Sequence, residues 1–128
     1  TGKLLRSLYC YAPVRCLTVC DGILYTGHSD CTVRAYKAQA PGGSDSPMFT
    51  LRGGHVGGLT SVEVYKTAEG LRLLCTDEAG GVVVWDAAQK KVIHSCTHPD
   101  GDKARRGVWR KEEGTILSAH DKGSLLEW

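Results

Sequence analysis

Two short segments hold the residue types of a nucleophilic catalytic site. Residues 28–31 read His-Ser-Asp-Cys, and residues 120–121 read His-Asp. A nucleophile needs a neighbouring base, and the base needs a third group that orients it. Side chains this close in sequence, in segments that we predict to be tight turns, favour hydrogen bonds to nearby backbone groups instead. We therefore expect both segments to be structural and assign no catalytic residue to them.

The acidic pair Asp77-Glu78 suggests a different chemistry, the paired carboxylates of glycoside hydrolysis. Such carboxylates must flank one glycosidic bond. Neighbouring residues of a strand point to opposite faces of a sheet, so these two are poorly placed to do so. The sequence also has no glycine-rich phosphate loop, no Gly-x-Ser-x-Gly elbow and no His-Glu-x-x-His segment. We expect a protein that is not an enzyme and that uses no cofactor.

The cysteines predict neither a zinc site nor disulfides. No Cys-x-x-Cys pair occurs, so a structural zinc site is not expected. All but one lie in runs typical of strands, where a buried free cysteine behaves as a small hydrophobic residue. Because disulfides persist in oxidising compartments, we expect reduced thiols and an intracellular protein, cytoplasmic or nuclear. The six are Cys10, Cys16, Cys20, Cys31, Cys75 and Cys96.

A charged segment at 98–106 is the remaining candidate site. It is simplest to interpret it as a solvated connection, although arginine can bind a carboxylate or phosphate with two hydrogen bonds. The net charge of +2 is too small to indicate nucleic acid or an anionic membrane surface. No apolar run approaches the roughly 18 residues of a membrane span. The charged residues are His98, Asp100, Asp102, Lys103, Arg105 and Arg106.

The elements that must position these residues are short strands between glycine-rich turns. Asp21-Gly22 predicts a tight turn, since both residues tolerate a positive φ. The Gly-, Ser- and Pro-rich stretch 38–47 predicts a long connecting loop. No ten-residue stretch has helical periodicity, so we predict an all-β domain. The expected strands are 4–10, 14–20, 23–27, 32–37, 48–52, 59–65, 71–76, 82–86, 91–96, 107–111, 116–119 and 124–128.

Three strand–turn–strand segments repeat along the chain, at 25–36, 74–85 and 117–128. Their last residues are Tyr36, Trp85 and Trp128, spaced 49 and 43 residues apart, close to the roughly 40–45 residues of a four-stranded propeller blade. Gly54-His55 opens one repeat, and Trp85-Asp86 closes its third strand. Over nearly the whole chain the pattern resembles the WD-repeat family. The resemblance implies β-propeller blades of four antiparallel strands, an incomplete ring within one chain, and a protein-interaction scaffold.

The resemblance also implies a buried network in each blade, built from a turn aspartate, a Gly-His histidine, a strand serine or threonine and the tryptophan. Each repeat has some of these residues and lacks others. The matching residues are Thr26 and Asp30, then His55 and Trp85, then Ser118 and Trp128. In the first repeat Tyr36 replaces the tryptophan, and in the second Cys75 replaces the hydroxyl residue and Ala79 the aspartate. In the third, Lys122 replaces the aspartate, with Asp121 one residue away, and the glycine before His98 is missing. We take Asp30, Tyr36, His55, Trp85, Asp86 and Trp128 as the structural repeat residues.

In this family, the loops between blades share one rim with the turns between second and third strands. By that resemblance we predict that a partner protein or peptide binds there. An RNA-binding module that uses the basic loop 103–106 is the alternative, and it predicts steeply salt-dependent RNA binding. The predicted rim residues are Ser29, Asp30, Arg52, His55, Asp77, Glu78, Arg105, Arg106, Asp121 and Lys122.

The number of repeats leaves the completion of the ring open. A propeller ring needs about four to eight blades, and residues 1–128 form one segment of about three, whose first strand at 3–10 would complete another blade. The other blades could belong to a longer chain. Two copies could instead form a six-bladed ring as a homodimer, each lending its first strand to the other. An open stack or another all-β fold is the third possibility.

Overall fold

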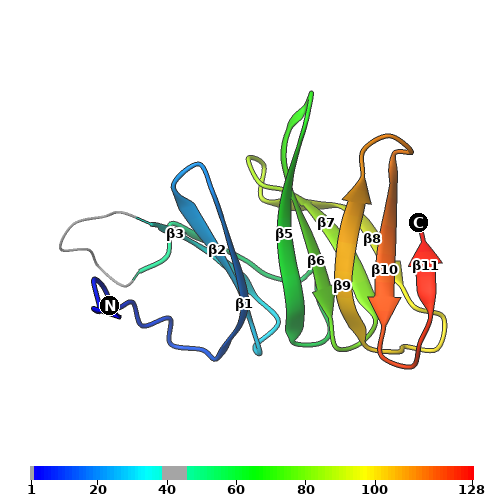
Figure 1. The fold of residues 1–128 in the computed structure, drawn as a ribbon, viewed down its shortest axis with the longest axis horizontal. Helices are drawn as coiled ribbons and strands as arrows, with labels where there is room; N and C mark the ends of the chain where they lie inside the picture. The colour runs from blue at the N-terminus through cyan, green and yellow to red at the C-terminus, as the bar shows by residue number, and fades with distance from the viewer. Residues whose placement is uncertain (1, 39–45) are drawn as a thin grey trace.

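The computed structural model describes residues 2–38 and 46–128, which form eleven strands in three groups (Figure 1). Most of the predicted loop at 38–47 lies outside the described residues. The described residues include no helix, and so none that could cross a membrane. The all-β prediction is confirmed.

The strands form three antiparallel sheets, which we number 1 to 3 in chain order. Sheet 1 contains β1 (Val14–Cys20), β2 (Ile23–His28), β3 (Val33–Lys37) and β4 (Phe49–Leu51). Sheet 2 contains β5 (Leu59–Thr67), β6 (Gly70–Asp77), β7 (Gly81–Asp86) and β8 (Lys91–Thr97). Sheet 3 contains β9 (Ala104–Arg110), β10 (Thr115–His120) and β11 (Leu125–Glu127). Each strand pairs with the next along the chain, as in a propeller blade.

The tight turns form where the sequence predicts them. Asp21 and Gly22 join β1 to β2 with φ angles of 51° and 75°, a conformation that glycine adopts freely and aspartate tolerates. Cys20 then pairs with Ile23 across the turn. This two-residue connection fixes the register of the first hairpin, and it places Thr26 and His28 at the far end of β2.

Sheet 2 is the centre of the core, because it is covered on both faces. Leu73 and Leu74 are consecutive on β6 and both fully buried, but they belong to different apolar clusters. The cluster of Leu73 includes Tyr25 of sheet 1, and the cluster of Leu74 includes Ile116 of sheet 3. Full burial of one such leucine contributes about 1.5–3 kcal/mol. The near-continuous apolar run 82–85 on β7 has the same explanation.

The N-terminal segment differs from the expected strand. Residues 2–13 contain no strand, and Leu4 and Leu5 are 78% and 88% exposed. An extended segment becomes a strand when a neighbour pairs with its backbone N–H and C=O groups, and no strand in the described part of the chain pairs with this one. Its assignment as the outer strand of another blade stays a prediction.

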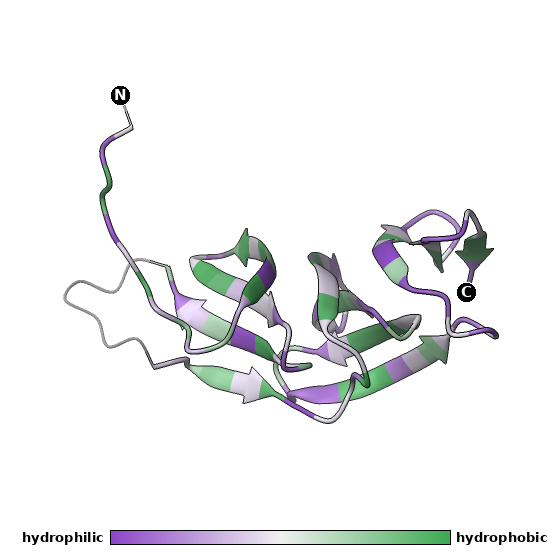
Figure 2. Cartoon of the chain, turned by 90° about the horizontal axis from the view of Figure 1, so that it is seen from below, coloured by the Kyte–Doolittle hydropathy of each residue, from purple (hydrophilic) through white to green (hydrophobic). Residues whose placement is uncertain are grey.

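The three sheets stand side by side, and the ring is not closed (Figure 2). The first strands of the sheets, β1, β5 and β9, are in contact in succession. Apolar residues remain exposed on both outer sheets, with Leu17 and Val19 on β1 and Val108 and Leu125 on sheet 3. The incomplete propeller predicted from the repeats is therefore confirmed, with four strands in sheets 1 and 2 and three in sheet 3.

Candidate functional site

All three sheets carry their connecting loops and their second-to-third-strand turns at one end, which we call the loop end. It comprises residues 11–15, 29–32, 52–60, 78–80, 98–105 and 121–124, which include the first residues of β1, β5 and β9, and lies along the lower edge of Figure 1. One backbone hydrogen bond ties turn to loop in each sheet. The amides of Ser29, Glu78 and Asp121 donate to the carbonyls of Pro13, Gly58 and Lys103 at 3.2, 2.9 and 2.9 Å. The repeat thus builds the same backbone frame three times.

A β-bulge recurs at the start of each first strand. The register of β1, β5 and β9 shifts between their first and third residues, so the second residue has no direct partner. These second residues are Arg15, Thr60 and Arg105. A bulge re-aims the side chain of the extra residue. Arg15 and Arg105 both have more than half of their side chains exposed, so sheets 1 and 3 each bring an exposed bulge residue to the loop end, whereas Thr60 of sheet 2 is half-buried and bonded to Thr76 and Ala104.

Sheet 2 contains a buried network formed by a histidine, a carboxylate and a tryptophan. His55 Nδ1 lies 2.8 Å from Asp77 Oδ2, and the Trp85 indole N–H donates to His55 Nε2 at 3.5 Å. The other oxygen, Asp77 Oδ1, accepts the backbone N–H groups of Ala79 and Gly81, each at 2.9 Å. Burial raises the pKa of Asp77, but the bonds from His55 and the two amides outweigh it, so the pKa is lowered overall. The network therefore holds an ionised carboxylate.

The alignment of repeats put Ala79 at the aspartate position, so it missed Asp77 as the network's acid. Asp77 lies two residues earlier, at the end of β6, where its side chain reaches both the loop histidine and the turn. The sequence held a clue, because the two residues directly before Ala79 are both acidic, Asp77 and Glu78. Spacing alone could not distinguish a strand-end carboxylate from a turn carboxylate.

Sheet 3 forms a network with a different composition. The Trp128 indole N–H donates to Ser118 Oγ at 2.8 Å, and Ser118 Oγ lies 2.8 Å from His120 Nε2. His120 Nδ1 donates to the backbone carbonyl of Asp102 at 3.0 Å. Since that nitrogen carries the proton, Nε2 accepts from the Ser118 hydroxyl. The result is one continuous chain of donors and acceptors from Trp128 to Asp102.

Sheet 1 repeats the sheet 3 pattern without its tryptophan. Thr26 Oγ1 lies 2.6 Å from His28 Nε2, and His28 Nδ1 donates to the Ala12 carbonyl at 3.2 Å. Burial lowers the pKa of His28, and the bond to Ala12 only partly offsets this. Asp30 is not part of the network: its carboxylate accepts from Thr32 and pairs with Arg34 at 2.8 Å. Asp30 therefore shapes the turn.

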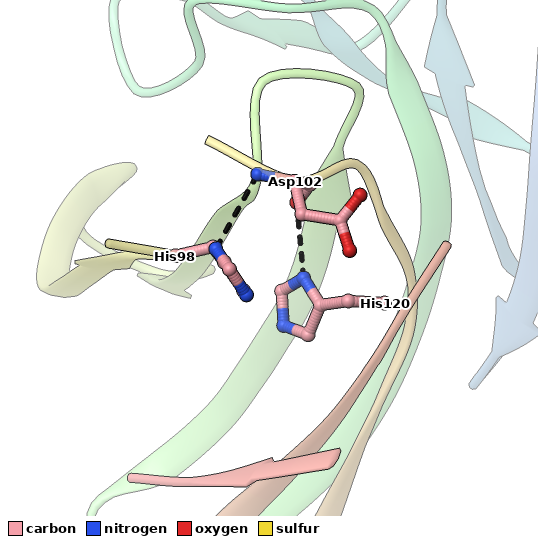
Figure 3. A group of neighbouring side chains, drawn as sticks. All are labelled: His98, Asp102 and His120. Atoms are coloured by element: carbon pink, nitrogen blue, oxygen red, sulfur yellow. Dashed lines mark hydrogen bonds between the residues drawn. The ribbon is translucent and has the colours of Figure 1, made fainter. Parts of the chain in front are cut away.

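His98, Asp102 and His120 form a cluster whose ligand-type atoms lie within 4.8 Å of one another (Figure 3). His98 Nδ1 accepts the backbone N–H groups of Asp100 and Asp102 at 3.1 and 3.4 Å, so Nε2 carries the proton and donates to Ser124 Oγ at 3.1 Å. His120 also uses both ring nitrogens. A metal ligand needs a free lone pair. The cluster fits a hydrogen-bonded network and does not fit a metal centre.

The structure separates the predicted rim residues into three groups. His55 and Asp77 are 8% and 2% exposed and bonded to each other, so they support the loop end from inside. Arg106 lies on β9 and pairs with Glu63 of β5 at 2.7 Å, away from the turns. The residues that the structure places on the loop end are Ser29, Asp30, Arg52, Glu78, Arg105, Asp121 and Lys122.

Sequence reasoning missed one exposed cation of the loop end, Arg15. Its guanidinium lies 4.0 Å from Glu78, and Lys103 approaches the same carboxylate to 3.9 Å. Arg15 falls in an apolar strand run, so the sequence alone suggested a buried strand. The bulge that exposes it follows from the repeated register shift and has no residue signature.

Among known proteins, the solved structures provide the match, and it concerns the fold. No family model matches the sequence, and neither does any curated protein. Among solved structures, the chain is similar to the WD40 domain of coronin from Toxoplasma gondii, with a TM-score of 0.76 and 17% identity. The match covers 91% of this chain and 30% of the coronin chain. At this identity the likeness concerns the fold, and with the strand order it shows that the chain has the fold of WD40 propeller blades in an unclosed ring.

Proposed function

We propose that the chain is a protein-interaction scaffold whose loop end binds a partner protein or peptide. The recurring bulge is the observation that carries this proposal. It presents Arg15 and Arg105 beside the turn residues Glu78 and Asp121 on a frame repeated in three sheets. Loops on a rigid β scaffold are well suited to binding, since the frame limits the ordering cost.

The residues that suggested catalysis have other tasks. His28 is buried and bonded to Thr26 and Ala12, and Cys31 donates to the Val56 carbonyl at 3.5 Å. Both groups therefore serve the structure of the turn, which supports a scaffold over an enzyme. The six free thiols fit the reducing interior of a cell.

The RNA-binding alternative receives less support. Residues 104–106 lie in β9 and not in the predicted loop. Each basic residue of 103–106 pairs with a carboxylate: Lys103 with Glu78, Arg105 with Asp121 and Arg106 with Glu63. The two arginines are held closely, at 2.7 Å each, so the loop end offers few free cations for the repeated phosphate contacts that RNA binding needs. A protein partner with its own mixture of charges suits this surface better.

The test is a selection of peptides from a displayed random library against the chain, followed by binding measurements with variants. We expect selected peptides to lose affinity for Arg105→Ala. The matched control is Lys111→Ala, which removes a cation from the exposed β9–β10 turn at the opposite end. Equal losses in both variants, or in neither, would contradict binding at the loop end.

The exposed apolar faces of sheets 1 and 3 suggest a second kind of contact. We infer that further blades cover them, supplied by other segments of a longer chain or by a second copy. Light scattering over a concentration series tests the second source. A stable dimer supports a ring shared by two copies, and a monomer contradicts it.

A further inference from the structure

Glu78 is the meeting point of cations from two neighbouring elements. It lies in the β6–β7 turn of sheet 2. Arg15 Nη1, from the bulge of β1, lies 4.0 Å from Glu78 Oε1. Lys103 Nζ, from the loop that leads into β9, lies 3.9 Å from the same oxygen. One carboxylate oxygen is therefore shared by two positive groups that approach from the flanking sheets.

The cations hold Glu78 loosely. Both distances exceed the 2.7–3.2 Å of a hydrogen bond. Other ion pairs of the loop end are tighter, with Arg105 at 2.7 Å from Asp121 and Arg34 at 2.8 Å from Asp30. The side chains of Arg15 and Glu78 are 53% and 40% exposed. Exposed pairs of this kind contribute little to stability, so another carboxylate can replace Glu78 at small cost.

The surroundings leave room for a partner at this point. Gly57 and Gly58 pass close beside the turn: a Cβ on Gly57 would lie 2.7 Å from the Ala79 nitrogen, and one on Gly58 would lie 3.5 Å from Glu78 Oε2. Because neither glycine has a side chain, the loop lies close to the turn without covering the Glu78 carboxylate. The neighbouring Val56 is 91% exposed and offers an apolar contact. An acidic residue flanked by an apolar one would match this combination.

We propose that Glu78 occupies, in the free protein, the position that a carboxylate of the partner takes in the complex. An aspartate or glutamate of a bound protein segment displaces Glu78 and lies between Arg15 and Lys103. Glu78 then competes with the partner, so it weakens binding and favours segments acidic enough to displace it. The inference rests on the proposed binding at the loop end and names the chemistry of the partner.

The test measures binding of a fluorescent peptide of Glu and Ser residues by anisotropy, with a Gln and Ser peptide as the probe control. Glu78→Gln removes the competitor, and we expect roughly two- to fivefold tighter binding of the acidic peptide. The matched control Glu112→Gln makes the same charge change in the exposed β9–β10 turn at the opposite end. Lys103→Gln should weaken binding by a similar factor, whereas Lys111→Gln should not.

Several outcomes would overturn the inference. One is that Glu78→Gln binds the acidic peptide no more tightly than Glu112→Gln, including the case in which neither binds. Another is an equal gain for the Gln and Ser peptide, or for a single-stranded RNA oligonucleotide, because the effect would then not be specific to a carboxylate. Library peptides that depend on Arg105 but are indifferent to Glu78→Gln would leave the loop-end proposal standing and reject only this one.

Discussion

In sheets 2 and 3 a hydrogen bond from a histidine ring connects a loop to a strand, but the histidine belongs to the loop in sheet 2 and to the strand in sheet 3. In sheet 2 the histidine comes from the loop, and His55 donates to Asp77 at the end of β6. In sheet 3 the histidine ends the strand, and His120 donates to the loop carbonyl of Asp102. His28 and Ala12 follow the sheet 3 arrangement. All three sheets require an imidazole N–H that donates to an oxygen across the gap between loop and strand. The donor and the acceptor can each come from the loop or from the strand.

The exchange changes the electrostatics of the blade. In sheet 2 the acceptor of the imidazole N–H is the buried carboxylate of Asp77, whereas in sheets 1 and 3 it is a backbone carbonyl. The buried Asp102 carboxylate of sheet 3 instead accepts the backbone N–H of Lys122. A buried charge must keep all its partners, because each unsatisfied group costs free energy. Sheet 2 should therefore be the most sensitive of the three to loss of a single side chain.

Asp77→Ala should produce the largest effect. It leaves the His55 N–H and the backbone N–H groups of Ala79 and Gly81 without their acceptor, and we expect a loss of about 3–5 kcal/mol in the free energy of unfolding, measured by urea denaturation. Asp121→Ala, an exposed acid of the loop end, is the control and should change stability little. Equal losses for both would refute the special role of sheet 2.

Ser118→Ala should come next. It interrupts the series of hydrogen bonds in sheet 3 and leaves the Trp128 N–H and His120 Nε2 unsatisfied. We therefore expect a loss of about 1–3 kcal/mol in the free energy of unfolding, by the same measurement. Ser95→Ala, at an exposed position of β8, is the control. A loss as large as that of Asp77→Ala would show that the carboxylate does not set sheet 2 apart.

The pH dependence should also distinguish the sheets. His28 has a lowered pKa in the folded protein, so the unfolded chain binds its proton first, and stability falls as the pH drops below the ordinary histidine value of 6.5. Asp77 has a lowered pKa too, so its contribution is present above 3.8 and is lost as the pH falls further. Denaturation from pH 7 to 3 should show both steps. His28→Gln should flatten the fall in stability below pH 6.5. An unchanged slope in that pH range would show that another group causes the fall.

The smallest effect should come from the turns. Cys31, Gly80 and Gly123 occupy equivalent positions with φ of 69°, 86° and 107°. Cys31→Gly and Cys31→Ala both lose the thiol bond to Val56, but only glycine relieves the left-handed conformation, so Cys31→Gly should be the more stable of the two by roughly 0.5 kcal/mol. Gly80→Ala should destabilise, since its Cβ would lie 2.7 Å from the Asp102 carbonyl. Thermal melts measure all three variants, and a Cys31→Gly variant less stable than Cys31→Ala would contradict the equivalence of the turns.

Hydrophobic patterning and turn residues were sufficient to predict the repeat and the positions of eleven strands, although β9 begins three residues earlier than expected. Val14–Cys20 and Lys91–Thr97, for example, lie within one residue of the expected ranges. Residues 3–10 have the same apolar character, but a strand also needs a neighbour that the pattern cannot supply. The network acid Asp77 and the exposed Arg15 were missed because a strand end and a bulge depend on register, which three-dimensional pairing sets.

The separation of the two ends of the sheets has a practical consequence for handling the protein. The β9–β10 turn, residues 111–114, is exposed at the end opposite the loops, and its positions 111–113 can carry an altered side chain, whereas Gly114 has a φ of 66° that disfavours one. A dye or surface linker attached there would leave the proposed binding surface at the loop end exposed to solution. An attachment through Cys31 would instead cover it.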